Sequence, residues 1–336
     1  MRTPTRIGIA LLITTATFGI GSPPARADGG GHAGADTIAS AIERVSPKSD
    51  RVTRPISNNR ASGRLVGVTV PVRGDGRLGV TAVGFARNAS VGLPSEVASS
   101  DVVVASDGMA TYTAADGGVS VGVRAFDDSV QLSAVLTSAK SGNALGFAIT
   151  PPAGSHMVVQ TDGSVLFVEA SGASASGGIA APWAKDANGA VLATYYSLNG
   201  NTLIQHVAVS ATTTYPVVAD PWLFINLIDH ATWHYTSPYG WTFQVYPTLW
   251  ARANAGSTAV GYADWDELYA RYKNAGLNTN LSGMRDQLVC HEIVVAIVQP
   301  TKASWNIDEW RPSVGLLSTI NAKCNPGNPG SGTIWD

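Results

Sequence analysis

Short runs that alternate apolar and polar residues fill the chain between residues 63 and 218, as in Val119-Ser-Val-Gly-Val-Arg124. Such alternation is typical of strands with one face in a core. Asp-Gly and Asn-Gly pairs separate several runs and supply the positive-φ positions of tight hairpins. We therefore expect an antiparallel β-sandwich or barrel over residues 63–221. The runs cover residues 65–72, 78–85, 102–105, 109–113, 119–126, 130–136, 145–149, 157–160, 165–169, 190–198 and 203–210.

A helical period replaces this alternation near the C-terminus. Residues 264–275 place Trp265, Leu268 and Tyr272 on one face. Asp264 stands at the position of an N-cap, with Glu267 at capping-box spacing. Two more helices are expected over 281–291 and 312–323, and strands over 223–233, 241–246 and 293–298. We thus predict a small α+β domain over residues 222–325, with a loose tail over 326–336.

Eight of the nine tryptophans lie at or after Trp222, directly behind two prolines in Tyr215-Pro-Val-Val-Ala-Asp-Pro221. Prolines this close resist both a helix and a central strand. The change in composition at this point indicates a boundary between the two predicted domains.

The N-terminus has the features of a secretory signal peptide over residues 1–27. Arg2 and Arg6 precede an apolar run over 7–21, and Ala25-Arg26-Ala27 follows as a cleavage motif. The alternative is an uncleaved anchor, but the apolar run is shorter than the ~20 residues of a spanning helix. We expect a secreted, extracellular or cell-wall-associated protein without a stable membrane span. Residues 28–62 are interpreted as a flexible leader with one short helix over 36–45, capped by Asp36.

The charge balance and the two cysteines bear on whether the protein binds nucleic acid, forms a disulfide or binds a metal. Removing residues 1–27 leaves 19 basic and 24 acidic residues, which gives no support for a nucleic-acid partner. In an exported chain the two cysteines, Cys290 and Cys324, are expected to form a disulfide. Their spacing does not fit a metal-binding cysteine motif, and we predict neither a metal nor a cofactor.

Several C-terminal motifs resemble an uncharacterised actinobacterial secreted family, the domain of unknown function 2599. They are Pro247-Thr-Leu-Trp-Ala-Arg252, Ala263-Asp-Trp-Asp-Glu-Leu268, Gly283-Met-Arg-Asp-Gln-Leu-Val-Cys-His291, Trp305-Asn-Ile-Asp-Glu-Trp-Arg-Pro312 and Cys324-Asn-Pro326. The preceding segment, which ends in Tyr215-Pro-Val-Val-Ala-Asp-Pro221, resembles β-rich presenter regions of actinobacterial secreted toxins and enzymes. The resemblance implies an exported presenter-plus-payload layout and no particular activity.

The candidate catalytic residues are His291, Glu292, Glu309 and Arg311. The disulfide is expected to draw the ends of two helices together and gather these side chains around one cleft. A histidine beside a carboxylate can act as a general base, and an arginine can hold an anionic group. The competing interpretation is a structural salt-bridge cluster at the helix ends.

The aromatic residues of the last domain form either a sugar-stacking platform or a core. We place Trp265 and Trp310 in the core. The candidate binding residues are Trp241, Trp250, Arg252 and Arg285.

Three functional hypotheses follow. The first is a secreted two-domain effector, toxin-like, whose C-terminal domain acts on a cell envelope as a hydrolase and has an envelope component or an immunity-like protein as its partner. The second is a non-catalytic module that binds cell-wall glycan. The third is an ordinary secreted hydrolase, which the lack of a familiar nucleophile motif such as G-x-S-x-G makes less favoured.

Overall fold

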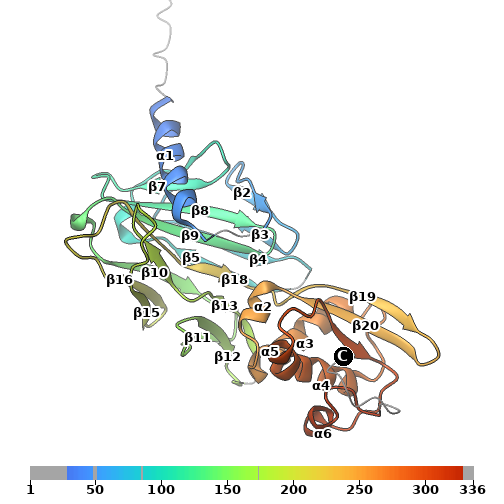
Figure 1. Cartoon of the computed structure of the whole chain (residues 1–336). Helices are drawn as coiled ribbons and strands as arrows, with labels where there is room; N and C mark the ends of the chain where they lie inside the picture. Colours follow the sequence, from blue (N-terminus) through green and yellow to red (C-terminus); the bar gives the residue numbers. More distant parts are fainter. Residues whose placement is uncertain (1–28, 48–50, 85, 173, 328–336) are drawn as a thin grey trace, which may run out of the picture.

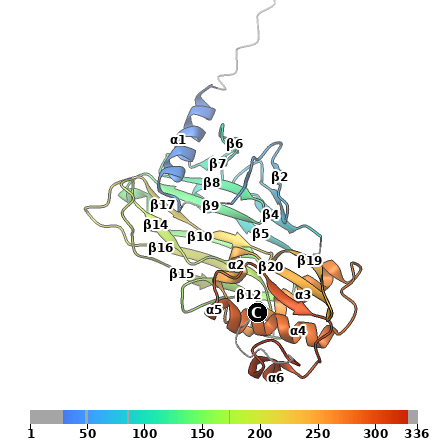
Figure 2. The ribbon, with the colours of Figure 1, turned by 45° about the vertical axis from the view of Figure 1, so that its right-hand side comes forward.

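The computed structural model describes residues 29–47, 51–84, 86–172 and 174–327. The predicted signal peptide over 1–27 and residues 328–336 of the predicted tail lie outside the described residues. Within the described part, no helix is both long and apolar enough to cross a bilayer. The chain forms two large antiparallel sheets and a smaller α+β region, as predicted (Figures 1 and 2).

The larger sheet has eleven strands, and its main path runs β11-β12-β13-β18-β9-β8-β7-β6. Along this path the strands are Ser155–Val159, Val165–Glu169, Ala175–Ile179, Trp222–Phe224, Ser129–Leu136, Val119–Phe126, Ala110–Thr113 and Val103–Val104. Beside it, β1 (Thr53–Arg54) pairs with β8, and β17 (Val217–Asp220) pairs with both β9 and β14 (Trp183–Lys185).

The second sheet has seven strands in the order β15-β16-β10-β5-β4-β3-β2. These strands are Thr194–Asn199, Thr202–Val207, Ala144–Thr150, Asn88–Gly92, Arg77–Ala82, Val66–Thr69 and Arg60–Ser62. One hydrophobic core takes side chains from both sheets, such as Phe147 of β10 and Leu132 of β9. The two sheets therefore pack face to face, as the alternating sequence pattern requires. Two short 3₁₀ helices, η1 (Ser95–Val97) and η2 (Ala139–Ser141), lie in the connections.

Helix α1 (Gly29–Val45) covers the outer face of the larger sheet (Figure 1). Its Ala39 and Ile42 pack with Met109 and Val135, which explains why β9 is buried along its whole length. This helix is longer than the predicted one, and Asp36 is not its cap. The Asp36 carboxylate instead accepts a hydrogen bond of 2.7 Å from the backbone N–H of Ser106. Most of the segment expected to be a flexible leader is thus packed structure.

The C-terminal region contains a three-stranded sheet in the order β19-β20-β21, covered by helices. Its strands are β19 (Ile228–Thr236), β20 (Gly240–Pro247) and β21 (Trp305–Asp308). Its helices are α2 (Leu249–Ala253), α3 (Thr258–Tyr272), α4 (Leu281–Cys290), the π-helix η3 (His291–Val295), α5 (Ala296–Val298) and α6 (Leu316–Asn321). The predicted disulfide between Cys290 and Cys324 is present.

Several predicted elements of this region differ from the structure. Helix α3 begins at Thr258, because the Ser257 side chain caps it by accepting from the Val260 N–H. Residues 293–298 are helical and do not form the predicted strand. The helical path that continues from α4 places Val295 beside Cys290 and Cys324 in a small hydrophobic cluster. Helix α6 is shorter than the predicted 312–323, and strand β21 was not predicted.

The two regions share a packed interface. Strand β18 carries Trp222–Phe224 into the larger sheet, so the sheet extends slightly past the predicted boundary. Phe224 and Leu166 of the β-rich region form one hydrophobic cluster with Trp250 and Val260 of the C-terminal region. A buried ion pair between Arg87 and Glu267 also crosses this interface, with Nη1 and Oε2 3.1 Å apart.

Candidate functional site

The three strands of the small sheet present one face as two rows of side chains. Trp233 lies opposite Phe243, and Phe243 lies opposite Ile307. The next pair on the same face, toward the turn of the hairpin, is Tyr235 opposite Trp241. Strand β21 follows the same alternation, and its continuation at Glu309 donates its N–H to the Trp241 carbonyl oxygen at 3.2 Å. The outer row is therefore Tyr235, Trp241 and Glu309.

The inner row is core and the outer row is surface. Phe243 and Ile307 are buried, and Trp233 stacks on Phe243 with ring centroids 4.3 Å apart. By contrast, Tyr235 and Trp241 are 52% and 46% exposed, and their rings meet edge to face at 5.3 Å. The hairpin extends beyond the helices that cover it (Figure 1), so its core-facing stripe continues into solvent.

A shallow cavity of about 330 Å³ lies where this cover ends, and we call it the hairpin pocket. Its lining is Trp233, Trp241, Ala275, Gly276 and Glu309. The Trp233 indole Nε1 donates to the Ala275 carbonyl oxygen at 3.0 Å. Gly276 has φ +101°, and a Cβ there would lie 3.0 Å from Trp233 Nε1, so glycine lets the chain pass close to the ring.

Glu309 supplies the charged wall of the hairpin pocket. Its Oε2 accepts a 2.9 Å hydrogen bond from the Thr279 hydroxyl. The Asn280 amide donates to the carbonyl oxygens of Glu309 and Arg311, at 2.9 and 2.7 Å. Within the described part of the chain, Glu309 Oε1 accepts no hydrogen bond from a side chain or backbone. The pocket therefore combines two indole rings with one acceptor oxygen available to a ligand.

The lining of the hairpin pocket is suited to holding a ring. Aromatic faces beside a hydrogen-bonding group are what a ring with an apolar face and a polar rim requires. Glycoside hydrolases generally place a pair of carboxyl groups across the bond they break. Among the described residues, Glu309 is the one carboxylate that lines the hairpin pocket.

The four predicted catalytic residues lie at opposite ends of α4. Glu309 and Arg311 contact Asn280, which precedes α4, whereas His291 and Glu292 follow its last residue. The 10 residues of α4 span about 15 Å at 1.5 Å per residue. The disulfide joins Cys290 to the segment after α6 and does not draw these four side chains into one cleft, which corrects that expectation.

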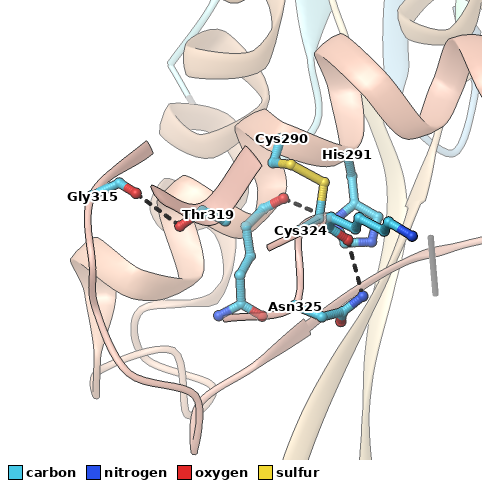
Figure 3. The surroundings of a disulfide bond; sticks show 8 residues. Cys290, His291, Gly315, Thr319, Cys324 and Asn325 are labelled. Carbon is cyan, nitrogen blue, oxygen red and sulfur yellow. Dashed lines mark hydrogen bonds between the residues drawn. A yellow bond between two sulfur atoms is a disulfide. The ribbon is translucent and has the colours of Figure 1, made fainter. Parts of the chain in front are cut away.

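His291 is fully buried, beside the disulfide (Figure 3). Its Nδ1 lies 2.8 Å from the Gln287 carbonyl oxygen, one turn earlier. The Gln287 side chain in turn bonds the backbone N–H and carbonyl of Asp308, at 2.8 and 3.0 Å. This end of α4 thus holds β21 in place and offers no open surface at the imidazole.

Glu292 and Asp264 form a buried carboxyl pair between η3 and α3. Both residues are 0% exposed, and among the described residues no oxygen of either carboxyl group has a partner at ordinary hydrogen-bond distance. The two groups still lie close enough to affect each other. Burial, followed by the negative charge of Glu267, raises the pKa of Asp264 well above its usual range. Burial and then Asp264 raise the pKa of Glu292 likewise, while Arg252 opposes the shift.

Arg311 makes a structural ion pair. Its Nε lies 2.5 Å from Asp308 Oδ2, and Asp308 Oδ1 accepts from the Thr242 hydroxyl. The guanidinium also lies over the Trp310 ring, 4.3 Å from its centroid. Trp310 is half-buried and stacks on Tyr239 at 5.1 Å, so the prediction that it belongs to the core was wrong. Trp265 is buried in the core, as predicted.

Of the four predicted binding residues, one lines the hairpin pocket and three do not. Trp241 lines the hairpin pocket, whereas Trp250 is 3% exposed and stacks on Phe224 at 5.0 Å, so Trp250 cannot present a face to a ligand. Arg252 donates to the Ala303 carbonyl oxygen and lies 5.7 Å from the Trp305 ring. Arg285 pairs with Asp286 at 3.0 Å. Neither arginine lines the hairpin pocket.

Sequence reasoning missed Trp233 as a lining residue of the hairpin pocket and Tyr235 as an exposed aromatic residue. The signal was the alternation of Trp233-His-Tyr235 against Trp241-Thr-Phe243, which places all four aromatic side chains on one face. Among the described residues, no group of three or more His, Cys, Asp or Glu side chains is placed to hold a metal ion.

Comparison with known proteins adds a family and no activity. The family described as "Protein of unknown function (DUF2599)" matches residues 228–327. Uncharacterised proteins of Mycobacterium tuberculosis and Mycobacterium bovis are each 34% identical over 104 residues, which is 31% of this chain and 68% of theirs. One of Mycobacterium leprae is 29% identical over 108 residues, which is 32% of this chain and 85% of its own.

Among solved structures, a family 81 glycoside hydrolase from Clostridium thermocellum aligns with 61% of this chain and 31% of its own length. The TM-score of 0.27 and the identity of 13% do not establish a common fold. The chain belongs to the DUF2599 family.

Proposed function

We propose that the C-terminal region is a carbohydrate-binding module that holds a sugar ring in the hairpin pocket. The observation that carries the proposal is the pairing of the exposed Trp241 ring with the Glu309 carboxylate in one small cavity. A pyranose has an apolar C–H face that can lie on an indole and a rim of hydroxyl groups that can donate to a carboxylate.

The size and position of the pocket support this function. A volume of about 330 Å³ lies near the lower limit for small-molecule sites, which suits one or two sugar rings better than a large cofactor. The hairpin of β19 and β20 reaches away from the β-rich region (Figure 1), which supports access of a polymer to it. In an exported protein, the ligand would be a polysaccharide of a cell envelope, and the β-rich region would present the module to it.

The direct test is retention of the full mature chain on isolated cell walls and on insoluble polysaccharides. Trp241→Ala should weaken retention at least tenfold, since losing one central aromatic contact commonly costs more than about 1.4 kcal/mol of binding free energy. Tyr195→Ala is the matched control, because Tyr195 is an exposed aromatic residue on a strand of the other region. Equal retention of the wild type and Trp241→Ala, or no retention on any glycan, would overturn the proposal.

A further inference from the structure

We infer that the hairpin pocket selects against acidic sugars and that Glu309 is the residue that determines this selectivity. The inference rests on the proposed carbohydrate-binding function and names the chemical class of the ligand. It predicts that neutral sugars and amino sugars bind, and that uronic acids are excluded.

The charge of the pocket comes from one side chain. Of the five lining residues, Glu309 is the one that is charged. Its nearest arginine along the chain, Arg311, is 8% exposed and pairs with Asp308, so this guanidinium is not directed at the pocket. A ligand on the Trp241 ring therefore meets a carboxylate with no described counter-charge in the lining.

Several hydrogen-bond donors around the pocket are already used within the protein, although the indole N–H of the exposed Trp241 is not among them. Trp233 Nε1 donates to Ala275, and the Thr279 hydroxyl donates to Glu309 Oε2. The Asn280 amide donates to two backbone carbonyl oxygens. These groups, which would otherwise be available to bind an anion, are committed to holding Glu309 and the 275–280 segment.

Besides the Trp241 indole N–H, the pocket offers a ligand the acceptor oxygen of the negatively charged Glu309 side chain. A hydroxyl group can donate to Glu309 Oε1, and an ammonium group can donate and also attract the carboxylate. A sugar carboxylate cannot donate, and it repels Glu309. At about 4 Å in a water-like dielectric, a pair of unit charges changes binding roughly fivefold, and salt reduces this effect.

Two pairs of oligosaccharides separate charge from sugar stereochemistry. In the first pair, a chitin hexasaccharide is compared with its deacetylated, cationic form. In the second, a methyl-esterified galacturonate hexasaccharide is compared with its free, anionic acid. The full mature chain is titrated with each by calorimetry, at low and at high salt.

For the wild type, we expect the cationic form to bind at least as tightly as its acetylated partner, and the anionic form to bind about fivefold more weakly than its ester. Glu309→Gln should bring both ratios towards one, and so should high salt. Glu96→Gln is the matched control, because it removes one exposed carboxylate from the other region and should leave both ratios unchanged.

Different failures have different meanings. Wild-type ratios near one, or ratios that Glu309→Gln does not move, would overturn the selectivity while Trp241-dependent binding of the neutral forms still supports the module. If only one pair binds, its ratio decides. If none of the four oligosaccharides binds, or if binding is unaffected by Trp241→Ala, the proposed function falls and the inference falls with it.

Discussion

Glu292 of the π-helix η3 and Asp264 of α3 bring two carboxyl groups together in the interior, where both residues are 0% exposed. Short π-helical segments such as η3 are rare in proteins. Around the pair lie Glu267 of α3, Arg87 of the β-rich region and Arg252 of α2. Because burial raises the pKa of both carboxyl groups, the stability of the folded C-terminal region should depend on pH.

The first prediction concerns that link. Because the folded-state pKa of both groups is raised, the folded state holds protons more tightly than the unfolded chain. The resulting stabilisation is present below the ordinary carboxyl pKa and is lost as the pH rises through the raised values. The free energy of unfolding should therefore decrease as the pH rises from below the ordinary carboxyl pKa through the raised pKa values of the pair. Glu292→Gln should reduce this decrease and be more stable than the wild type at the higher pH.

Urea unfolding across the pH range measures this effect, with Glu96→Gln as the control for loss of one acidic group. A variant with the same pH slope as the wild type would show that the buried pair does not carry the dependence.

The second prediction concerns the interface between the two regions. Glu267 receives hydrogen bonds from the backbone N–H groups of Leu227 and Ile228 and pairs with Arg87 and Arg271. Removing one partner of a buried ion pair commonly costs about 3–5 kcal/mol, because the other charge stays buried. Glu267→Gln should lower the free energy of unfolding by roughly that amount.

Glu43→Gln provides the comparison, since Glu43 pairs with Arg124 but its side chain is 68% exposed. Solvent screening should make its effect much smaller. Similar losses for the two variants in thermal unfolding would contradict the interface role of Glu267.

The third prediction separates two tryptophans. Trp250 packs against Phe224, and a Cβ on Gly178 would lie 2.4 Å from the Trp250 ring. Trp250→Ala should therefore cost about 3–5 kcal/mol of stability, as other buried aromatic truncations do. Trp241→Ala, at the surface, should change the unfolding midpoint little while weakening glycan retention. The reverse order of stabilities would be incompatible with the burial of these two rings.

The fourth prediction concerns the disulfide. Cys290 and Cys324 are 34 residues apart, and closing a loop of this length stabilises a fold by about 3–4 kcal/mol in the chain-entropy treatment. The double variant Cys290→Ser, Cys324→Ser should unfold at a correspondingly lower temperature. Where it is still folded, it should retain glycan like the wild type, because the hairpin pocket lies at the other end of α4. Loss of retention in folded protein would show that the bond also shapes the pocket.

Much of the fold was predictable from local signals. Alternation and Asp-Gly turns predicted the face-to-face antiparallel sheets, and the pairing of Cys290 with Cys324 followed from their number and the expected compartment. The predicted beginning of α3 was wrong. Ser257 caps this helix, and Asp264, which was expected to be the cap, is a buried residue in its interior. Residues 293–298 have the composition of a strand, but packing beside the disulfide keeps them helical.

By itself, the sequence determined which segments alternate and which domain carries most of the tryptophans, because these are properties of neighbouring residues along the chain. It also determined the disulfide, because the chain has only two cysteines. Only the tertiary structure decided that Trp241 is exposed and Trp250 buried, and that Glu309 joins Trp241 while Glu292 faces Asp264. Burial depends on where a covering helix ends and on which distant segment packs against a side chain. The alternation within one strand shows which side chains share a face, but it does not show which part of that face is covered.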